Sequence, residues 1–372
     1  MLHVRPVGAS WAARCASAAC RVGTMCVPLV HTLWRKIVTK TSRREEWLSW
    51  VGATIAVLVV QGSTLFVAFR AVAQSEDARA RAHTTRRPPT RPLQGRLSIV
   101  LPCAYEHAFM VRTVRSVYRA TPSRHLAEIL VVDDGSEPPL KSLLPNASRY
   151  RARFIRHERP LGLIAAKNTG GNAAVGDVVV FFDCHVLPAE NYWQPFLEHT
   201  SANYRRVVVP TITKLDVKTW QDVSPPRQVD GMSKCYLTFD AEFKWTTDRT
   251  DAVPVMSGGL LAITKRWWNE TGGYDATMAG WGGENIDQSL RVWRCGGEIV
   301  SAPSSRVAHM WRDGSRLTRA RYKVSARTVA LNRARAAKAH MGAFFEKTLT
   351  FPAFQQWVGD GGSALDTSAI SS

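Results

Sequence analysis

The chain has 372 residues, of which 45% are hydrophobic and 21% are charged, so it can bury a large core and is not disordered overall. Its formal net charge of +19 at pH 7 would suit nucleic acid or an anionic membrane surface. Basic residues are concentrated before residue 97 and from Arg312 to Lys338, without a helix-turn-helix, zinc-type cysteine pattern or aromatic RNA-binding motif. We therefore interpret the charge as flank and surface charge and expect no nucleic-acid partner.

Residues 48–69, LSWVGATIAVLVVQGSTLFVAF, contain no charged side chain and match the ~20 apolar residues that cross a bilayer. They predict a transmembrane helix after an N-terminal segment, residues 1–47. A cleaved signal peptide, the alternative, would lie nearer the start and have a shorter apolar core. More basic residues flank the span on its amino side than on its carboxyl side, which predicts a cytosolic amino terminus and a luminal domain in the secretory pathway.

The polar, arginine- and proline-rich residues 70–95 predict a solvated stem, and residues 343–372 a tail. Over residues 96–342, apolar runs such as LSIVLPC, EILVVDD and DVVVFFDCH alternate with helical patterns. Continuous Val, Ile and Leu runs are typical of strands buried on both faces. The sequence therefore predicts an α/β fold whose mixed, mainly parallel sheet carries helices on both faces.

Four cysteines follow the predicted span, and none has the spacing of a zinc site: Cys103, Cys184, Cys235 and Cys295. In an oxidising compartment they could form disulfides, and as buried thiols they would serve packing. The sequence leaves both alternatives open.

Acidic residues end two predicted strands, at the sheet edge where parallel sheets bind ligands. Asp133 and Asp134 close VVDD, and Asp183 closes VFFD. Since Asp-Gly-Ser is also good turn chemistry, Asp133 and Asp134 serve either a turn or the uracil and ribose of a nucleotide.

Asp183 and His185 lie two residues apart, so their side chains share a face of an extended chain. An oxygen and a nitrogen ligand without a thiolate favour a borderline cation such as Mn²⁺, which also binds diphosphate oxygens. His309, after a later apolar run, is the candidate third ligand. The alternatives are a polar surface pair and a structural histidine.

The segment GWGGENIDQSLRVWRCGG, residues 280–297, is the densest motif. Glu284 and Asn285 present polar groups where a helix is predicted to begin, and we expect both, with Trp281, to be catalytic residues. Trp281, beside two glycines, forms either a wall for a sugar or phosphate or part of the core. A second glycine pair, Gly258 and Gly259 in VMSGGLLAI, would let the backbone approach a bound sugar.

The ordered series VVDDGS, GLIAAKN, FFDCH, VMSGGLLAI, WGGEN, WRCGG and SRVAHMWR resembles the catalytic domain of the polypeptide N-acetylgalactosaminyltransferases, over about residues 97–339. These are retaining enzymes with a GT-A fold. The resemblance implies Mn²⁺ held by Asp183, His185 and His309, and uridine bound by Asp133 or Asp134. The remaining implied donor-site residues are Arg312 at the diphosphate, and Gly258, Gly259, Trp281 and Glu284 around the sugar and leaving group.

The resemblance also implies a function. The chain would move GalNAc or another N-acetylhexosamine from a UDP-sugar to a protein Ser/Thr hydroxyl or a glycan acceptor, as a single-pass type II protein of the Golgi membrane. Two alternatives are an inverting transferase with Glu284 as the base and a non-catalytic sugar-nucleotide-binding homologue.

The chain departs from the family pattern at several positions. Ala165 stands where the family has an arginine, and Lys167 would supply part of that charge at the donor site. Pro102 and Tyr105 replace a usual Thr and Asn, whereas Glu106 is retained. Ser304 replaces a usual cysteine, and we expect the family's carboxyl-terminal lectin domain to be absent.

Overall fold

The computed structural model describes residues 95–224, 234–246, 250–312 and 323–342. The predicted membrane span 48–69, the segment before it, nearly all of the stem and the tail lie outside the described residues. Among the helices that are described, none combines the length and the hydropathy that a bilayer crossing requires.

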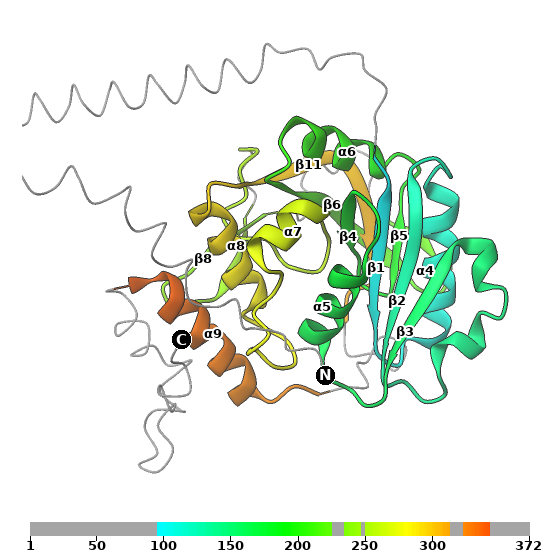
Figure 1. The fold of residues 1–372 in the computed structure, drawn as a ribbon, viewed down its shortest axis with the longest axis horizontal. Coiled ribbons are helices and arrows are strands. Elements are labelled where there is room, and N and C mark those ends of the chain that lie inside the picture. Colours follow the sequence, from blue (N-terminus) through cyan, green and yellow to red (C-terminus); the bar gives the residue numbers. More distant parts are fainter. Residues whose placement is uncertain (1–94, 225–233, 247–249, 313–322, 343–372) are drawn as a thin grey trace, which may run out of the picture. The chain divides into compact units, whose positions relative to one another are not determined.

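The described residues form a nine-stranded sheet in the order β3-β2-β1-β4-β10-β6-β11-β5, with β7 paired to β6 (Figure 1). A separate two-stranded sheet pairs β8 (Lys234–Leu237) with β9 (Phe243–Thr246). The strands of the large sheet are β1 (Leu97–Cys103), β2 (Leu126–Asp134), β3 (Ala152–His157), β4 (Val178–Phe181), β5 (Val186–Pro188), β6 (Arg206–Asp216), β7 (Gln221–Asp222), β10 (Leu261–Thr264) and β11 (Glu298–His309).

The sheet is mixed and mainly parallel, as the sequence predicts. Strands β3, β2, β1 and β4 run parallel, and β11 is parallel to β6. Strand β10 is antiparallel to both β4 and β6, so β6 and β11 run in the same direction as β4. The carboxyl ends of β1, β2, β4 and β11 therefore share one edge of the sheet.

Helices cover both faces of the sheet because its strands are apolar on both. All seven residues of β1 are buried, and they alternate between two hydrophobic clusters, with Leu101 in one and Val100 in the other. The first cluster lies under α4 (His107–Ala120) and α6 (Trp193–Ala202). The second lies under α5 (Leu163–Ala173), α7 (Lys265–Thr271), α8 (Glu284–Arg294) and α9 (Ala326–His340). Short 3₁₀ helices, η1 (Leu140–Leu143) and η2 (Ala147–Tyr150), follow β2.

Helix α4 illustrates how the sequence produces this packing. Met110, Val114 and Val117 recur at helical spacing and are fully buried against the sheet, whereas Arg115 between them is exposed. The helix ends at Ala120, where the Thr121 hydroxyl bonds back to the Val117 carbonyl at 2.7 Å. Helix α4 thereby fixes the chain that leaves the carboxyl end of β1.

Candidate active site

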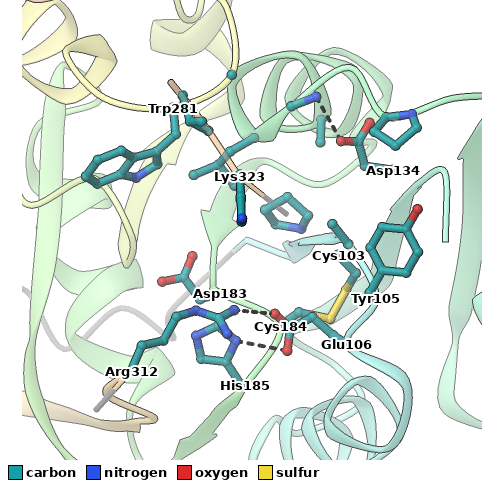
Figure 2. A pocket seen from close by; sticks show the side chains of 18 of the residues that line it. Cys103, Tyr105, Glu106, Asp134, Asp183, Cys184, His185, Trp281, Arg312 and Lys323 are labelled. Atoms are coloured by element: carbon teal, nitrogen blue, oxygen red, sulfur yellow. Dashed lines mark hydrogen bonds and ion pairs between the residues drawn. A yellow bond between two sulfur atoms is a disulfide. The ribbon is translucent and has the colours of Figure 1, made fainter. Parts of the chain in front are cut away.

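A cleft lies at the shared carboxyl edge of the sheet. Its larger part is a cavity of about 570 Å³, lined by residues that follow β1, β2, β4 and β11 and by the loops at residues 160–163 and 280–281 (Figure 2). A smaller cavity of about 230 Å³ shares five lining residues with it: Leu163, Asp183, Trp281, His309 and Trp311. The two cavities are therefore neighbouring compartments that meet at these five residues.

The three predicted metal ligands meet at this junction. Asp183, His185 and His309 each offer a ligand atom, and these atoms all lie within 4.8 Å of one another. The segment from Asp183 to His185 links β4 to β5, and β5 pairs with β11 so that His309 lies opposite Val186. That pairing brings the imidazole of His309 to the aspartate, with Nε2 3.0 Å from Asp183 Oδ2.

The protonation states of this group suit a divalent cation. Burial alone would raise the pKa of Asp183, but its hydrogen bond with His309 and the charges of His309, His185 and Lys167 hold it below its usual range. Burial lowers the pKa of His309, against the opposing effect of Asp183. One carboxylate and two imidazoles are a donor set that fits Mn²⁺, without any thiolate.

The two aspartates at the end of β2 have different places. The Asp133 carboxylate lines neither cavity and accepts hydrogen bonds from Ser136 N at 3.0 Å and Arg156 Nη1 at 2.7 Å. It holds the turn that follows the strand. Asp134 lines the larger cavity and accepts from the backbone N–H groups of Leu161 and Gly162, each at 2.8 Å. Of the pair, only Asp134 lies where a ligand could meet it.

A buried ion pair lies beside the smaller cavity. Lys167 is 1% exposed, donates to the Gly258 carbonyl at 2.8 Å, and lies 3.7 Å from Glu284 Oε1. Glu284 begins α8, and its Oε2 accepts from the Gly282 N–H at 2.7 Å. Lys167, Gly258 and Glu284 all line this cavity, so a ligand there would face both charges.

Close packing explains the second glycine pair. A Cβ on Gly259 would lie 2.8 Å from Asp183 Oδ2, so only glycine leaves this carboxylate in place. Gly258 has a φ of +86°, and a Cβ there would meet Asn285. Both glycines line the smaller cavity, as expected for a backbone that approaches a ligand.

Trp281 and Asn285, the other two candidate residues of the 280–297 segment, have different surroundings in the structure. Trp281 is 44% exposed and lines both cavities, so its indole faces the cleft and not the core. Asn285 lines neither cavity, which corrects its expected place among the catalytic residues. Its side chain is buried and donates to the Met256 carbonyl at 2.9 Å, so it anchors the start of α8 to the chain before Gly258.

Several cleft residues are not predicted by the motifs. Glu106 and Lys323 line the larger cavity together with the predicted Arg312. A disulfide joins Cys103 to Cys184, the residue between the predicted metal ligands Asp183 and His185. It decides the open question for these two cysteines in favour of pairing, whereas Cys235 is a buried free thiol. The sequence indicated a role for Glu106 only in that this residue matches the family pattern.

The chain is similar in sequence to known glycosyltransferases. Residues 98–267 match the family described as Glycosyl transferase family 2, and residues 246–312 match the N-terminal domain of galactosyltransferase. The chain is 35% identical over 246 residues to polypeptide N-acetylgalactosaminyltransferase 11 of Xenopus tropicalis, covering 60% of this chain and 39% of the relative. It is 37% identical over 237 residues to the inactive polypeptide N-acetylgalactosaminyltransferase-like protein 5 of Macaca fascicularis, covering 60% and 53%.

A solved structure with the same fold is the crystal structure of GalNAc-T7 with UDP, GalNAc and Mn²⁺. It superposes with a TM-score of 0.60 at 26% identity, covering 68% of this chain and 50% of that one. The chain thus spans about half the length, or less, of the relatives it matches. The residues matched by the two family models, 98–312, contain most of the cleft lining and the predicted metal ligands Asp183, His185 and His309.

Proposed function

We propose that this chain, whose described part is a glycosyltransferase domain of the polypeptide N-acetylgalactosaminyltransferase type, transfers GalNAc or another N-acetylhexosamine from a UDP-sugar to a protein Ser/Thr hydroxyl. The domain has the GT-A fold. The observation that carries the proposal is the convergence of Asp183, His185 and His309 between two cavities, one bordered by Arg312 and the other by Glu284.

The residues along the cleft have different roles in the proposed reaction. Mn²⁺, when bound by Asp183, His185 and His309, supplies positive charge that offsets the charge developing on the departing diphosphate. Arg312 borders the larger cavity on the same side and donates hydrogen bonds to phosphate oxygens. Asp134 fixes the loop at Leu161 and Gly162, which bounds the place for the uridine.

The contacts of Glu284 fit a positioning role in a retaining reaction. Its side chain is buried, accepts from the Gly282 N–H and lies 3.7 Å from the Lys167 ammonium, so it is held in a fixed position. Such a group orients a sugar and an acceptor hydroxyl. In a retaining reaction the acceptor attacks from the side of the leaving group, and the departing diphosphate accepts the hydroxyl proton. Glu284 is then a positioning group and not the base.

The cellular setting is part of the proposal. Residues 48–69 anchor the chain as a single-pass type II protein, with residues 96–342 in the lumen of the Golgi or another secretory compartment. The disulfide between Cys103 and Cys184 supports this, because disulfides form and persist in oxidising compartments.

The test uses the full chain with Mn²⁺, a panel of UDP-sugars, and a threonine-rich peptide added or omitted. We expect peptide-dependent release of UDP from UDP-GalNAc or a related donor, and a product with the anomeric configuration of the donor. A product of opposite configuration, with activity abolished in Glu284→Gln, would replace the proposal with the inverting alternative.

A non-catalytic sugar-nucleotide-binding protein is the second candidate. Two observations favour it: Ala165 replaces the arginine of the family pattern, and one relative is named an inactive transferase-like protein. UDP binding by calorimetry, without UDP release from any donor or acceptor combination, would support this candidate. Restoration of turnover by Ala165→Arg would identify the missing charge as the cause.

A further inference from the structure

Glu106 lies at the corner where β1 leads into α4, directly beside the metal-ligating residues. Its side chain is buried, with 8% exposed, and it lines the larger cavity. The residues on either side have positive φ angles, +59° at Tyr105 and +27° at His107, a conformation that L-residues rarely adopt. Such backbone strain clusters at functional sites, where the surrounding structure holds it in place.

The two carboxylate oxygens of Glu106 face two different groups of the cleft. Oε2 lies 3.3 Å from Nδ1 of His185, and Oε1 accepts from Nη2 of Arg312 at 2.6 Å (Figure 2). His185 belongs to the group proposed to hold the metal, and Arg312 lines the larger cavity, where the diphosphate is proposed to bind. Because Nδ1 of His185 faces Glu106, the other ring nitrogen, Nε2, remains for a metal.

A disulfide and two hydrogen bonds connect the backbone near Glu106 to the segment that carries Asp183 and His185. The disulfide joins Cys103, at the end of β1, to Cys184, which lies between Asp183 and His185. From α4, the Thr113 hydroxyl donates to the Cys184 carbonyl at 3.1 Å and accepts from the Val186 N–H at 3.2 Å. The corner that carries Glu106 and the segment that carries His185 therefore behave as one rigid unit.

We propose that Glu106 is a positioning residue, which orients His185 for the metal through Oε2 and Arg312 for the diphosphate through Oε1. A carboxylate that accepts from the second nitrogen of a metal-bound imidazole fixes the ring and strengthens its ligand nitrogen. Glu106 is placed to do this for His185, whose buried Nδ1 has no other partner among the described residues, and it already holds the Arg312 guanidinium, so it would link metal binding to donor binding. The inference rests on the metal site of the proposed function.

The experiment measures Mn²⁺ affinity of the full chain from the electron paramagnetic resonance signal of free Mn²⁺. Glu106→Gln keeps the size of the side chain and removes its charge, and we expect the Kd to rise about 10- to 100-fold. The matched control is Glu298→Gln, because Glu298 also pairs with an arginine, Arg206, at 2.6 Å and lines neither cavity. It should keep the Kd of the unmodified chain.

The Arg312 half of the inference has its own measurement. UDP affinity is determined by calorimetry at a Mn²⁺ concentration that saturates each variant, so that metal loss does not contribute. We expect weaker UDP binding in Glu106→Gln and unchanged binding in Glu298→Gln. An Mn²⁺ Kd and a UDP affinity both equal to those of the unmodified chain would overturn the inference.

A purely structural role would give a different result. It would lower the midpoint of thermal unfolding and leave the Kd unchanged at temperatures well below that midpoint, which would also contradict the inference. Should Glu106→Gln fail to fold, Glu106→Asp keeps the charge but is too short to face both partners. It should weaken Mn²⁺ or UDP binding, and unchanged affinities for both would be evidence against positioning.

The two proposals fail in distinguishable ways. Mn²⁺ binding that depends on Glu106, without transfer to any acceptor, would leave this inference standing and remove the proposed function. Absence of Mn²⁺ binding by the unmodified chain would remove both.

Discussion

Asp183 Oδ2 lies 3.0 Å from His309 Nε2, although the two residues are 126 positions apart in the chain. Asp183 lies in the link that follows β4 and His309 ends β11, and these strands are separated in the sheet by β10 and β6. The short strand β5 closes the distance, because it pairs with β11 at His309. The metal site therefore depends on the pairing of β5 with β11.

Asp183→Asn should abolish stabilisation by Mn²⁺. A ligand at 100 times its Kd stabilises the folded state by about 2.7 kcal/mol, and this gain disappears when a charged metal ligand is removed. The measurement is thermal unfolding with and without Mn²⁺. Asp222→Asn is the control, since Asp222 bonds to Thr213 and lines neither cavity. An undiminished Mn²⁺-dependent shift in Asp183→Asn would exclude this residue as a ligand.

Gly259→Ala should impair metal binding more than folding. The added Cβ would lie 2.8 Å from Asp183 Oδ2 and would displace this carboxylate, so the Kd for Mn²⁺ should rise at least several-fold. Gly272→Ala is the control because its Cβ would meet nothing within 4 Å, although its φ of +80° costs about 1 kcal/mol of stability. Equal Mn²⁺ affinity in the two variants would contradict the prediction.

Removal of the disulfide by Cys103→Ser with Cys184→Ser should cost about 2–5 kcal/mol of unfolding free energy. The bond closes a loop with a sequence separation of 81 residues, and cross-linking reduces the entropy of the unfolded chain. Denaturant unfolding with and without reductant measures the effect. Reductant should destabilise the unmodified chain and not the double variant. Equal sensitivity of both proteins would show that this bond does not form.

Stability should fall at alkaline pH in part through Tyr192. Burial raises the pKa of its phenol, against the opposing hydrogen bond with Thr121, so the folded state keeps a proton that the unfolded state releases above pH ~10. The contribution is fully present below that pH. It is lost as pH rises, by up to about 1.4 kcal/mol per pH unit.

Tyr192→Phe tests this through the pH dependence of the unfolding free energy between about pH 9 and 11. The variant loses the Thr121 hydrogen bond at every pH, but its stability should decline less steeply than that of the unmodified chain. Tyr236→Phe changes an exposed tyrosine and should leave the slope unchanged. Parallel curves for all three proteins would refute the prediction.

The fold class was predictable because the causes of secondary structure are local. Runs such as LSIVLPC and DVVVFFDCH are typical of strands buried on both faces, and their alternation with helical patterns predicted the α/β class. The antiparallel insertion of β10 between β4 and β6 was not predictable, since strand order depends on long-range pairing.

The sequence by itself determined that Asp183 and His185 lie close together, because they are two residues apart directly after a buried strand. Only the tertiary structure decided that His309 completes the group, that Asp134 lines the cavity and Asp133 closes a turn, and that Asn285 packs away from the cleft. Each of these depends on pairing register and on contacts between distant segments. Composition and residue spacing do not show which distant segments of the chain will contact one another.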